Sequence, residues 1–137
     1  MGTRDSLLGI GVDAVTISEI ERLDREADGF TQRTFSPREK EESEQRGAAR
    51  ASYLAGRFAA KEAVFKALAH LTPEKTFDLR IVETLAAPDG SPQIQMTPAL
   101  SHICEKSSVD HILVSLTNEG DLAIAFAAAV GASREPC

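Results

Sequence analysis

The sequence predicts an α+β fold in which one long helix packs on a mainly antiparallel sheet. Apolar residues recur at helical spacing from Ala48 to about His70. Most of the short, strand-like segments are joined by turn residues, as in hairpins. Long helices combined with hairpin-connected strands favour this class over a doubly wound parallel sheet. The 137 residues contain no repeat or linker, so residues 1–137 are expected to form one domain.

The N-terminal segments are expected to form a strand and then two helices. Leu7 to Val12 is almost entirely apolar, which indicates a buried strand. Thr16 or Ser18 is expected to cap the first helix, and Gly29 is expected to end it. The second helix is expected to begin at Ser36, which is followed by the proline and the glutamate of a capping box.

The long helix is expected to carry its larger apolar side chains on one stripe. At about 100° per residue, that stripe consists of Leu54, Phe58, Phe65, Leu68 and Ala69. Glu62 lies beside the stripe and not on the opposite, solvated face. Its carboxylate is therefore expected to be partly desolvated and to need a partner.

The C-terminal half is expected to form two strands, a short helix and a final hairpin. A turn signal, Pro88-Asp89-Gly90, separates the first two strands. The expected segments, in order, are Leu79–Thr84, Gln93–Met96, Pro98–Ser107, Ile112–Thr117 and Leu122–Val130.

Composition and charge argue against several classes of partner. The hydrophobic and charged fractions, 42% and 26%, are ordinary for a globular protein. A net charge of −6 argues against nucleic acid, whose phosphates require a basic surface. The longest apolar run, Leu122 to Val130, is too short to span a bilayer, and the polar N-terminus is unlike a secretion signal. We therefore expect no membrane partner and a cytoplasmic location.

The cysteines and histidines show no metal-ligand spacing. Cys104 is expected to be a buried free thiol and Cys137 an exposed one, which is consistent with a reducing cytoplasm. His70, His102 and His111 are expected to be isolated surface or structural residues.

Two segments combine carboxylates with cations in a way that suits a phosphorylated ligand. The run Gly9-Ile10-Gly11-Val12-Asp13 ends a strand on a carboxylate. The expected helix from Gly56 to Leu68 carries Glu62 together with three cations, Arg57, Lys61 and Lys66. Two carboxylates from separate elements can share one hard cation, and Mg²⁺ typically binds one or two carboxylates plus substrate phosphates. Lysine and arginine bind phosphate groups.

From the residues alone, simpler interpretations stay open. Glu62 and Lys66 could form only a helix-stabilising i,i+4 ion pair, which contributes about 0.2–0.5 kcal/mol. Asp13 could be a turn residue at a strand end. Arg57 and Lys61 could belong to a solvated basic face.

The two segments resemble the signatures of the 4′-phosphopantetheinyl transferases, most closely the small holo-acyl-carrier-protein synthases. The string Gly-Arg-Phe-Ala-Ala-Lys-Glu-Ala-x-x-Lys-Ala, which starts at Gly56, matches that family's motif residue for residue. Phe35–Glu39 is similar to the start of the family's second helix, and Val114–Ala123 to its last hairpin. The resemblance runs from Gly9 to about Val130 and implies a single-copy 4′-phosphopantetheinyl transferase fold.

The resemblance implies catalytic roles for three residues. Asp13 and Glu62 would be the metal ligands, for Mg²⁺ or alternatively Mn²⁺. Glu62 would also be a candidate general base, acting directly or through water. Lys66 would stabilise charge on the transferring phosphoryl group or on the leaving nucleotide.

The resemblance also implies a binding site for coenzyme A. Arg57 and Lys61, four residues apart on the helix, would contact its phosphates. Ser115 and Thr117 share one strand face and would line the nucleotide cleft, although half-exposed polar strand residues are an equally good interpretation.

The implied reaction is transfer of the 4′-phosphopantetheine arm. A serine hydroxyl of an apo acyl or peptidyl carrier protein would attack the β-phosphate of coenzyme A, the co-substrate, and adenosine 3′,5′-bisphosphate would leave. Larger relatives contain about two copies of the fold with the site between them. A single-copy chain must build that cleft by association, so the resemblance implies a homotrimer.

Several positions depart from the family's pattern. Leu113 stands where the family usually has a histidine, Asn118 replaces a frequent histidine or aspartate, and Glu19 replaces a frequent arginine. The glycine loop that follows the signature helix in the family is also missing. These departures leave one alternative open, a non-catalytic relative that binds a carrier protein or coenzyme A.

Overall fold

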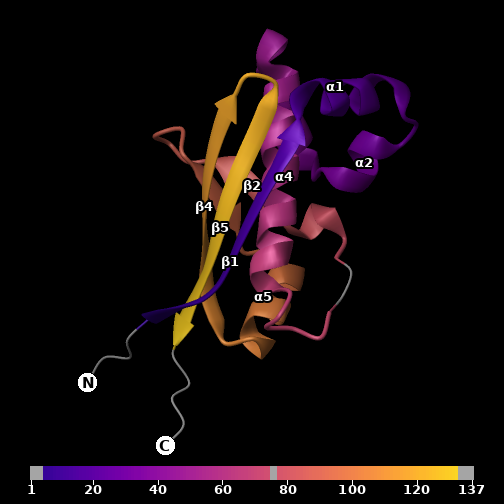
Figure 1. The fold of residues 1–137 in the computed structure, drawn as a ribbon. Coiled ribbons are helices and arrows are strands. Elements are labelled where there is room, and N and C mark those ends of the chain that lie inside the picture. The colour runs from indigo at the N-terminus through magenta and orange to yellow at the C-terminus, as the bar shows by residue number, and fades with distance from the viewer. Residues whose placement is uncertain (1–4, 75–76, 133–137) are drawn as a thin grey trace, which may run out of the picture.

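The chain forms two antiparallel sheets beside one long helix (Figure 1). The computed structural model describes residues 5–74 and 77–132. The elements are, in order, β1 (Asp5–Thr16), α1 (Ile17–Glu26), α2 (Phe30–Thr34), α3 (Pro37–Glu44), the 3₁₀ turn η1 (Gly47–Ala49), α4 (Arg50–Leu68), the 3₁₀ turn η2 (Leu79–Ile81), β2 (Glu83–Ala86), β3 (Pro92–Gln95), α5 (Pro98–Lys106), β4 (Val109–Glu119) and β5 (Leu122–Ala132). The predicted α+β class is confirmed.

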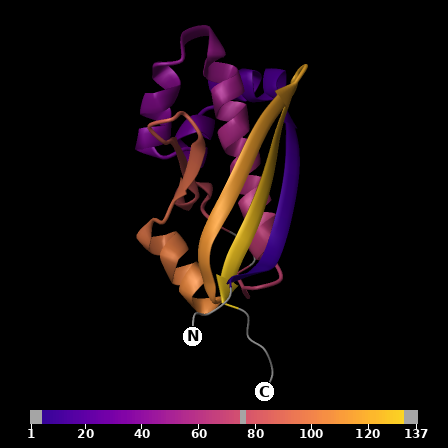
Figure 2. The same cartoon turned by 90° about the vertical axis from the view of Figure 1, so that its left-hand side faces the viewer.

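The larger sheet joins the two ends of the chain. Its order is β1-β5-β4, so the first and last strands pair side by side. α4 lies along one face of this sheet, and the β2–β3 hairpin lies beside β4 (Figures 1 and 2). In the described part of the chain, no helix is long and apolar enough to cross a membrane.

Small residues form the contact between α4 and the larger sheet. Alternate residues of β5 are fully buried: Ala123, Ala125, Ala127 and Ala129. The last three of these pack in the same core cluster as the buried alanines of α4: Ala59, Ala60, Ala63 and Ala67. Ala123 packs in a second cluster with Leu54 and Ala55. The helix is therefore more enclosed than one apolar stripe predicts, while Phe58 and Phe65 of that predicted stripe are only half-buried.

Two glycines bring β1 against α4. A Cβ atom at Gly9 would lie 2.0 Å from the carbonyl oxygen of Ala67, and one at Gly11 would lie 1.9 Å from that of Ala63. Only a residue without a side chain permits this approach. Asp13 follows two residues later on the same face of the strand, so the glycines decide how close its carboxylate comes to the helix.

The start of α3 follows the prediction. The hydroxyl of Ser36 accepts a hydrogen bond from the backbone N–H of Glu39 at 3.2 Å, and the Glu39 carboxylate accepts one from the N–H of Ser36 at 2.9 Å. The capping box is therefore confirmed. The cap of α1 differs, because Thr16 occupies the N-cap position without a side-chain bond and Ser18 binds Asp121 instead.

The end of the first helix was predicted wrongly. α1 stops at Glu26, before Gly29. Gly29 has a left-handed backbone with φ of 76° and precedes α2, a short helix that the sequence did not predict. A glycine with positive φ can follow the end of one helix or precede the start of the next. Gly29 in the sequence therefore did not decide where α1 ends.

The expected strand from Leu79 begins late. Leu79–Ile81 is a 3₁₀ turn, and β2 starts only at Glu83. The ammonium of Lys61 accounts for the difference, because it binds the carbonyl oxygens of Leu79 at 2.9 Å and Val82 at 2.7 Å.

Of the two cysteines, the structure describes one. Cys104 is buried and free, as expected, and burial raises the pKa of its thiol to about 11. Cys137 lies outside the described residues.

Candidate functional site

Asp13, Glu62 and Lys66 meet where β1 passes α4. The ammonium of Lys66 donates to Asp13 Oδ1 at 3.1 Å and to the carbonyl oxygen of Val12 at 3.0 Å. Glu62 lies one helical turn before Lys66 and is half-buried, whereas the Lys66 side chain remains exposed. The structure thus brings the three predicted catalytic residues to one place.

The two carboxylates carry more negative charge than Lys66 balances. Burial raises the pKa of Glu62, the charge of Asp13 raises it further, and Lys66 opposes both effects. Among residues 5–74 and 77–132, no group of three or more His, Cys, Asp or Glu side chains could hold a metal ion. Two carboxylates alone suit Mg²⁺, which commonly completes its shell with waters and substrate phosphates.

The raised pKa of Glu62 predicts competition between protons and the metal. A carboxylate must be ionised to bind a cation. Because the pKa of Glu62 is raised, protons would compete with a metal bound there at a higher pH than for an ordinary glutamate. We expect the acid side of the pH–rate profile to move to lower pH as Mg²⁺ is increased. Steady-state rates measured against pH at several Mg²⁺ concentrations test this. A profile whose acid side stays at the same pH at every Mg²⁺ concentration would contradict the prediction.

A second feature is a pocket of about 290 Å³ between α4 and the end of β4. Its lining residues are Arg46, Ala49, Ser52, Tyr53, Gly56, Arg57, Leu116, Thr117 and Asn118. The lining contains two guanidinium groups and no carboxylate, so the pocket suits an anion.

Arg57 is held firmly in this pocket. Its Nε donates to the carbonyl oxygen of Thr84 at 3.2 Å, and its guanidinium lies 4.2 Å from the centre of the Tyr53 ring. Arg46 lies 4.8 Å from the centre of the same ring. A second nitrogen of Arg57 is 3.7 Å from Glu42. The Tyr53 hydroxyl donates to Glu42 at 2.6 Å, which fixes the ring beneath the arginine.

Of the other three predicted coenzyme A residues, Thr117 lines the pocket, whereas Lys61 and Ser115 do not. Lys61 is fully buried and donates to Glu39 at 2.7 Å and to two backbone carbonyls, so its ammonium cannot reach a bound phosphate. That prediction is wrong because the face shared by Arg57 and Lys61 packs against β2 and α3. Thr117 lines the pocket with Arg57, but Ser115 lines a neighbouring groove of about 490 Å³ between β3 and β4.

Asp13, Glu62 and Lys66 together are called the acid site below. The acid site and the arginine pocket lie on different sides of α4. Glu62 follows Arg57 by five residues, which places the two side chains about 140° apart around a helix with 3.6 residues per turn. Asp13 lies on β1 and Thr117 on β4, and β5 separates these strands. One chain therefore presents the three residues and the arginine pocket on surfaces that face in different directions.

The sequence and the fold agree with one known family. The family model described as 4′-phosphopantetheinyl transferase superfamily matches residues 9–127. The chain belongs to this superfamily. The holo-[acyl-carrier-protein] synthase of Desulforudis audaxviator is 40% identical over 128 residues, which cover 93% of this chain and 95% of the relative. That of Methylobacterium sp. is 38% identical over 136 residues, with coverages of 96% and 99%.

Solved structures of holo-acyl-carrier-protein synthases share the fold. The enzyme of Neisseria meningitidis superposes with a TM-score of 0.79 at 31% identity, over 90% of this chain and 98% of the other. The Helicobacter pylori synthase, in complex with coenzyme A, has a TM-score of 0.72 at 26% identity, over 88% and 98%. The chain is therefore a phosphopantetheinyl transferase of the small synthase type.

Sequence reasoning missed two residues of this transferase's pocket. Tyr53 and Arg46 contribute the ring and the second guanidinium. Tyr53 stands four residues before Arg57, so the two share a helix face, and that spacing could have indicated the stacked pair. Arg46 precedes the turn η1, and no local pattern places it there.

Proposed function

We propose that this chain is a Mg²⁺-dependent holo-acyl-carrier-protein synthase. It transfers the 4′-phosphopantetheine arm of coenzyme A to a serine of an apo acyl or peptidyl carrier protein and releases adenosine 3′,5′-bisphosphate. The observation that carries the proposal is the meeting of Asp13, Glu62 and Lys66 at the contact between β1 and α4.

Asp13 and Glu62 are the proposed ligands of the metal. When bound there, Mg²⁺ would neutralise charge on the pyrophosphate of coenzyme A. Lys66 is exposed beside the carboxylates and supplies a further positive charge for the transferring phosphoryl group. Glu62 would accept the serine proton, directly or through water.

The arginine pocket is the proposed site for a phosphate and the nucleotide of coenzyme A. Arg57 and Arg46 supply the positive charge, and Thr117 and Asn118 supply polar groups at the rim. The H. pylori synthase is described in complex with coenzyme A, which supports this ligand for the present chain.

The decisive experiment is a mass measurement on apo carrier proteins. Incubation with coenzyme A and Mg²⁺ should add the mass of the phosphopantetheine arm to at least one carrier of a panel covering fatty-acid, polyketide and peptide synthesis. A non-catalytic relative would bind carrier or coenzyme A without any mass change. The intact Asp13, Glu62 and Lys66 constellation favours the enzyme over that alternative.

The outer face of the larger sheet supports assembly into a homotrimer. Its exposed apolar side chains include Ile10, Val12, Leu113 and Phe126. Apolar patches of this kind commonly mark protein interfaces. Association would cover this face and bring the acid site of one subunit toward the arginine pocket of the next, so a cyclic trimer would contain three complete sites.

Phe126→Asp is expected to abolish both assembly and transfer. The Phe126 side chain is 46% exposed, so a charge there leaves the core of one chain intact but opposes burial in an interface. Light scattering should report a monomer with unchanged circular dichroism. A fully active monomer, of either the variant or the original chain, would contradict the proposed trimer. The charge-neutral Phe126→Leu is the matched control and should stay trimeric.

Carrier docking is expected to respond to Glu19. The segment from Glu19 to Asp28 contains five acids and two arginines. Glu19 pairs with Arg22, which lowers the pKa of Glu19 and occupies a cation that an acidic carrier could use. Glu19→Arg should raise kcat/KM on an acidic carrier at low salt, and by less at high salt, where screening weakens the attraction. An unchanged rate at low ionic strength would show that Glu19 has no part in docking.

A further inference from the structure

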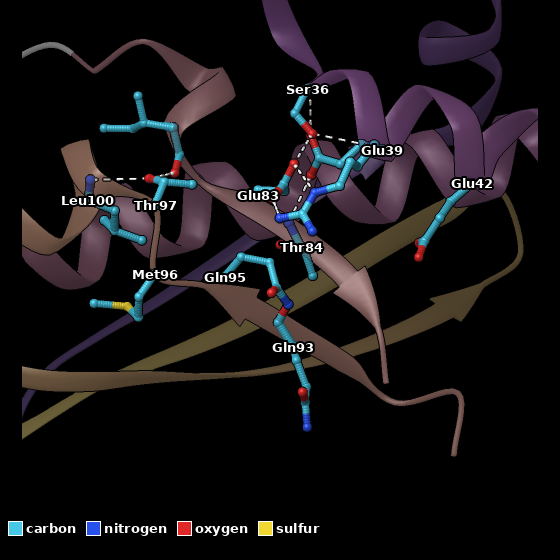
Figure 3. Close-up of polar contacts among 12 residues, drawn as sticks. Ser36, Glu39, Glu42, Glu83, Thr84, Gln93, Gln95, Met96, Thr97 and Leu100 are labelled. Atoms are coloured by element: carbon cyan, nitrogen blue, oxygen red, sulfur yellow. Dashed lines mark hydrogen bonds and ion pairs between the residues drawn. The ribbon is translucent and has the colours of Figure 1, made fainter. Parts of the chain in front are cut away.

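Along its outer edge, β2 forms hydrogen bonds with charged side chains and not with another strand. β2 pairs with β3 along its other edge. Along the outer edge, four backbone groups bind α3 and α4 in turn: Val82 O accepts from Lys61 at 2.7 Å, Thr84 N donates to Glu39 at 2.9 Å, Thr84 O accepts from Arg57 Nε at 3.2 Å, and Ala86 N donates to Glu42 at 3.2 Å. Figure 3 shows Ser36, Glu39, Glu83 and Thr84 gathered between α3 and β2.

The centre of this arrangement is a buried ion pair. Lys61 and Glu39 lie 2.7 Å apart, and both side chains are fully buried. Lys61 also binds two carbonyl oxygens, and Glu39 also accepts from the N–H of Ser36. A buried pair adds little net stability, because desolvation offsets most of the attraction. A fully bonded pair does, however, fix the orientation of whatever it holds.

One residue, Thr84, links this pair to the arginine pocket. Thr84 donates its N–H to Glu39 and accepts the Arg57 Nε–H at its carbonyl oxygen. We propose that Glu39 and Lys61 are positioning residues that hold the Arg57 guanidinium in its pocket through the backbone of Thr84. This inference rests on the proposed function, in which Arg57 contacts coenzyme A.

Glu39→Gln is the first test. Glutamine keeps the size of the side chain but has only one acceptor oxygen. In Glu39, Oε1 accepts from the Ser36 N–H and the Lys61 ammonium, and Oε2 accepts from the Thr84 N–H, so the variant cannot keep all three bonds. We expect KM for coenzyme A to rise about tenfold, equivalent to about 1.4 kcal/mol of binding. At saturating substrates kcat should stay within about twofold, because the reacting atoms lie at Asp13 and Glu62.

Glu83→Gln is the matched control. Glu83 is also a buried carboxylate and is the first residue of β2, but its side-chain hydrogen bonds in the described part of the chain go to Ser36 and Arg38 and not to Arg57. Its KM for coenzyme A should not change.

A double-mutant cycle with Arg57→Met separates positioning from a general loosening of the fold. If Glu39 acts through Arg57, adding Glu39→Gln to Arg57→Met should cause no further rise in KM. A further tenfold rise would overturn the inference and leave the coenzyme A site standing. If Arg57→Met alone left KM unchanged, the proposed site itself would be wrong and the inference would fall with it.

A charge-neutral variant covers the case in which Glu39→Gln does not fold. Glu39→Met combined with Lys61→Met replaces the buried ion pair with apolar side chains of similar size, which should restore the melting temperature but leaves the Thr84 N–H without its acceptor. The positioning role predicts that KM stays about tenfold raised and that hydrogen exchange at the Arg57 Nε–H, followed by NMR, becomes faster. A normal KM and a protected Nε–H in this stable variant would overturn the inference.

Discussion

Replacing Asp13 or Glu62 with alanine should reduce turnover at least about a hundredfold, the scale for losing a key electrostatic group at a reacting centre. The two carboxylates are the only proposed protein ligands of the metal, so neither can compensate for the other. The measurement is the initial rate of carrier modification at saturating Mg²⁺, coenzyme A and apo carrier. Omission of Mg²⁺, with a chelator present, should have a similar effect on the unmodified chain.

Glu105→Ala is the control for this experiment. Glu105 is an exposed acid on α5, away from the β1–α4 contact, and its loss should leave the rate unchanged. Near-normal transfer by Asp13→Ala or Glu62→Ala at saturating Mg²⁺ would rule out the proposed metal site.

Gly11→Ala should destabilise the fold by at least about 3 kcal/mol, the upper part of the range for overpacked cores. Its new methyl group would meet the backbone of α4 at 1.9 Å. A backbone carbonyl cannot rotate away as a side chain can, so strand and helix must separate. The free energy of unfolding from urea titration measures this effect. Because separation also moves Asp13 from Glu62, the residual folded fraction should bind Mg²⁺ poorly.

Gly56→Ala provides a control of opposite sign. The same chemical change at Gly56 would place a Cβ 3.6 Å from a Leu116 methyl group, an ordinary contact. Alanine inside a helix is more favourable than glycine by about 0.5–1 kcal/mol, so this variant should be more stable than the original chain. Equal effects at Gly11 and Gly56 would show that the close approach of β1 and α4 has no special role.

Local patterns drew attention to Asp13 and Glu62, but the family resemblance implied their roles as metal ligands. Helical periodicity placed Glu62 beside the apolar stripe of the long helix. The strand that was expected to end at Val12 continues to Thr16, so Asp13 lies within β1 and not at its end. The structure brings the two residues and Lys66 together.

Non-local contacts explain where sequence reasoning failed. The spacing of Arg57 and Lys61 correctly gave them a shared helix face, but not what covers that face. Glu39 lies 22 residues before Lys61 and reaches it only after α3 folds back onto α4. Lys61 also binds the carbonyl oxygens of Leu79 and Val82, so these groups do not extend β2 toward Leu79. Lys61 was therefore predicted to be accessible to a phosphate, because its own segment gives no sign of the distant partner Glu39.

The charged side chains along β2 also bear on solubility. An open strand edge is a template for aggregation, because any extended chain can add to it. Proteins often protect such an edge with a covering element. Here four side chains already occupy the donors and acceptors of β2, from Val82 to Ala86. A foreign strand would have to displace a buried ion pair before it could attach, so the short hairpin is protected on this side.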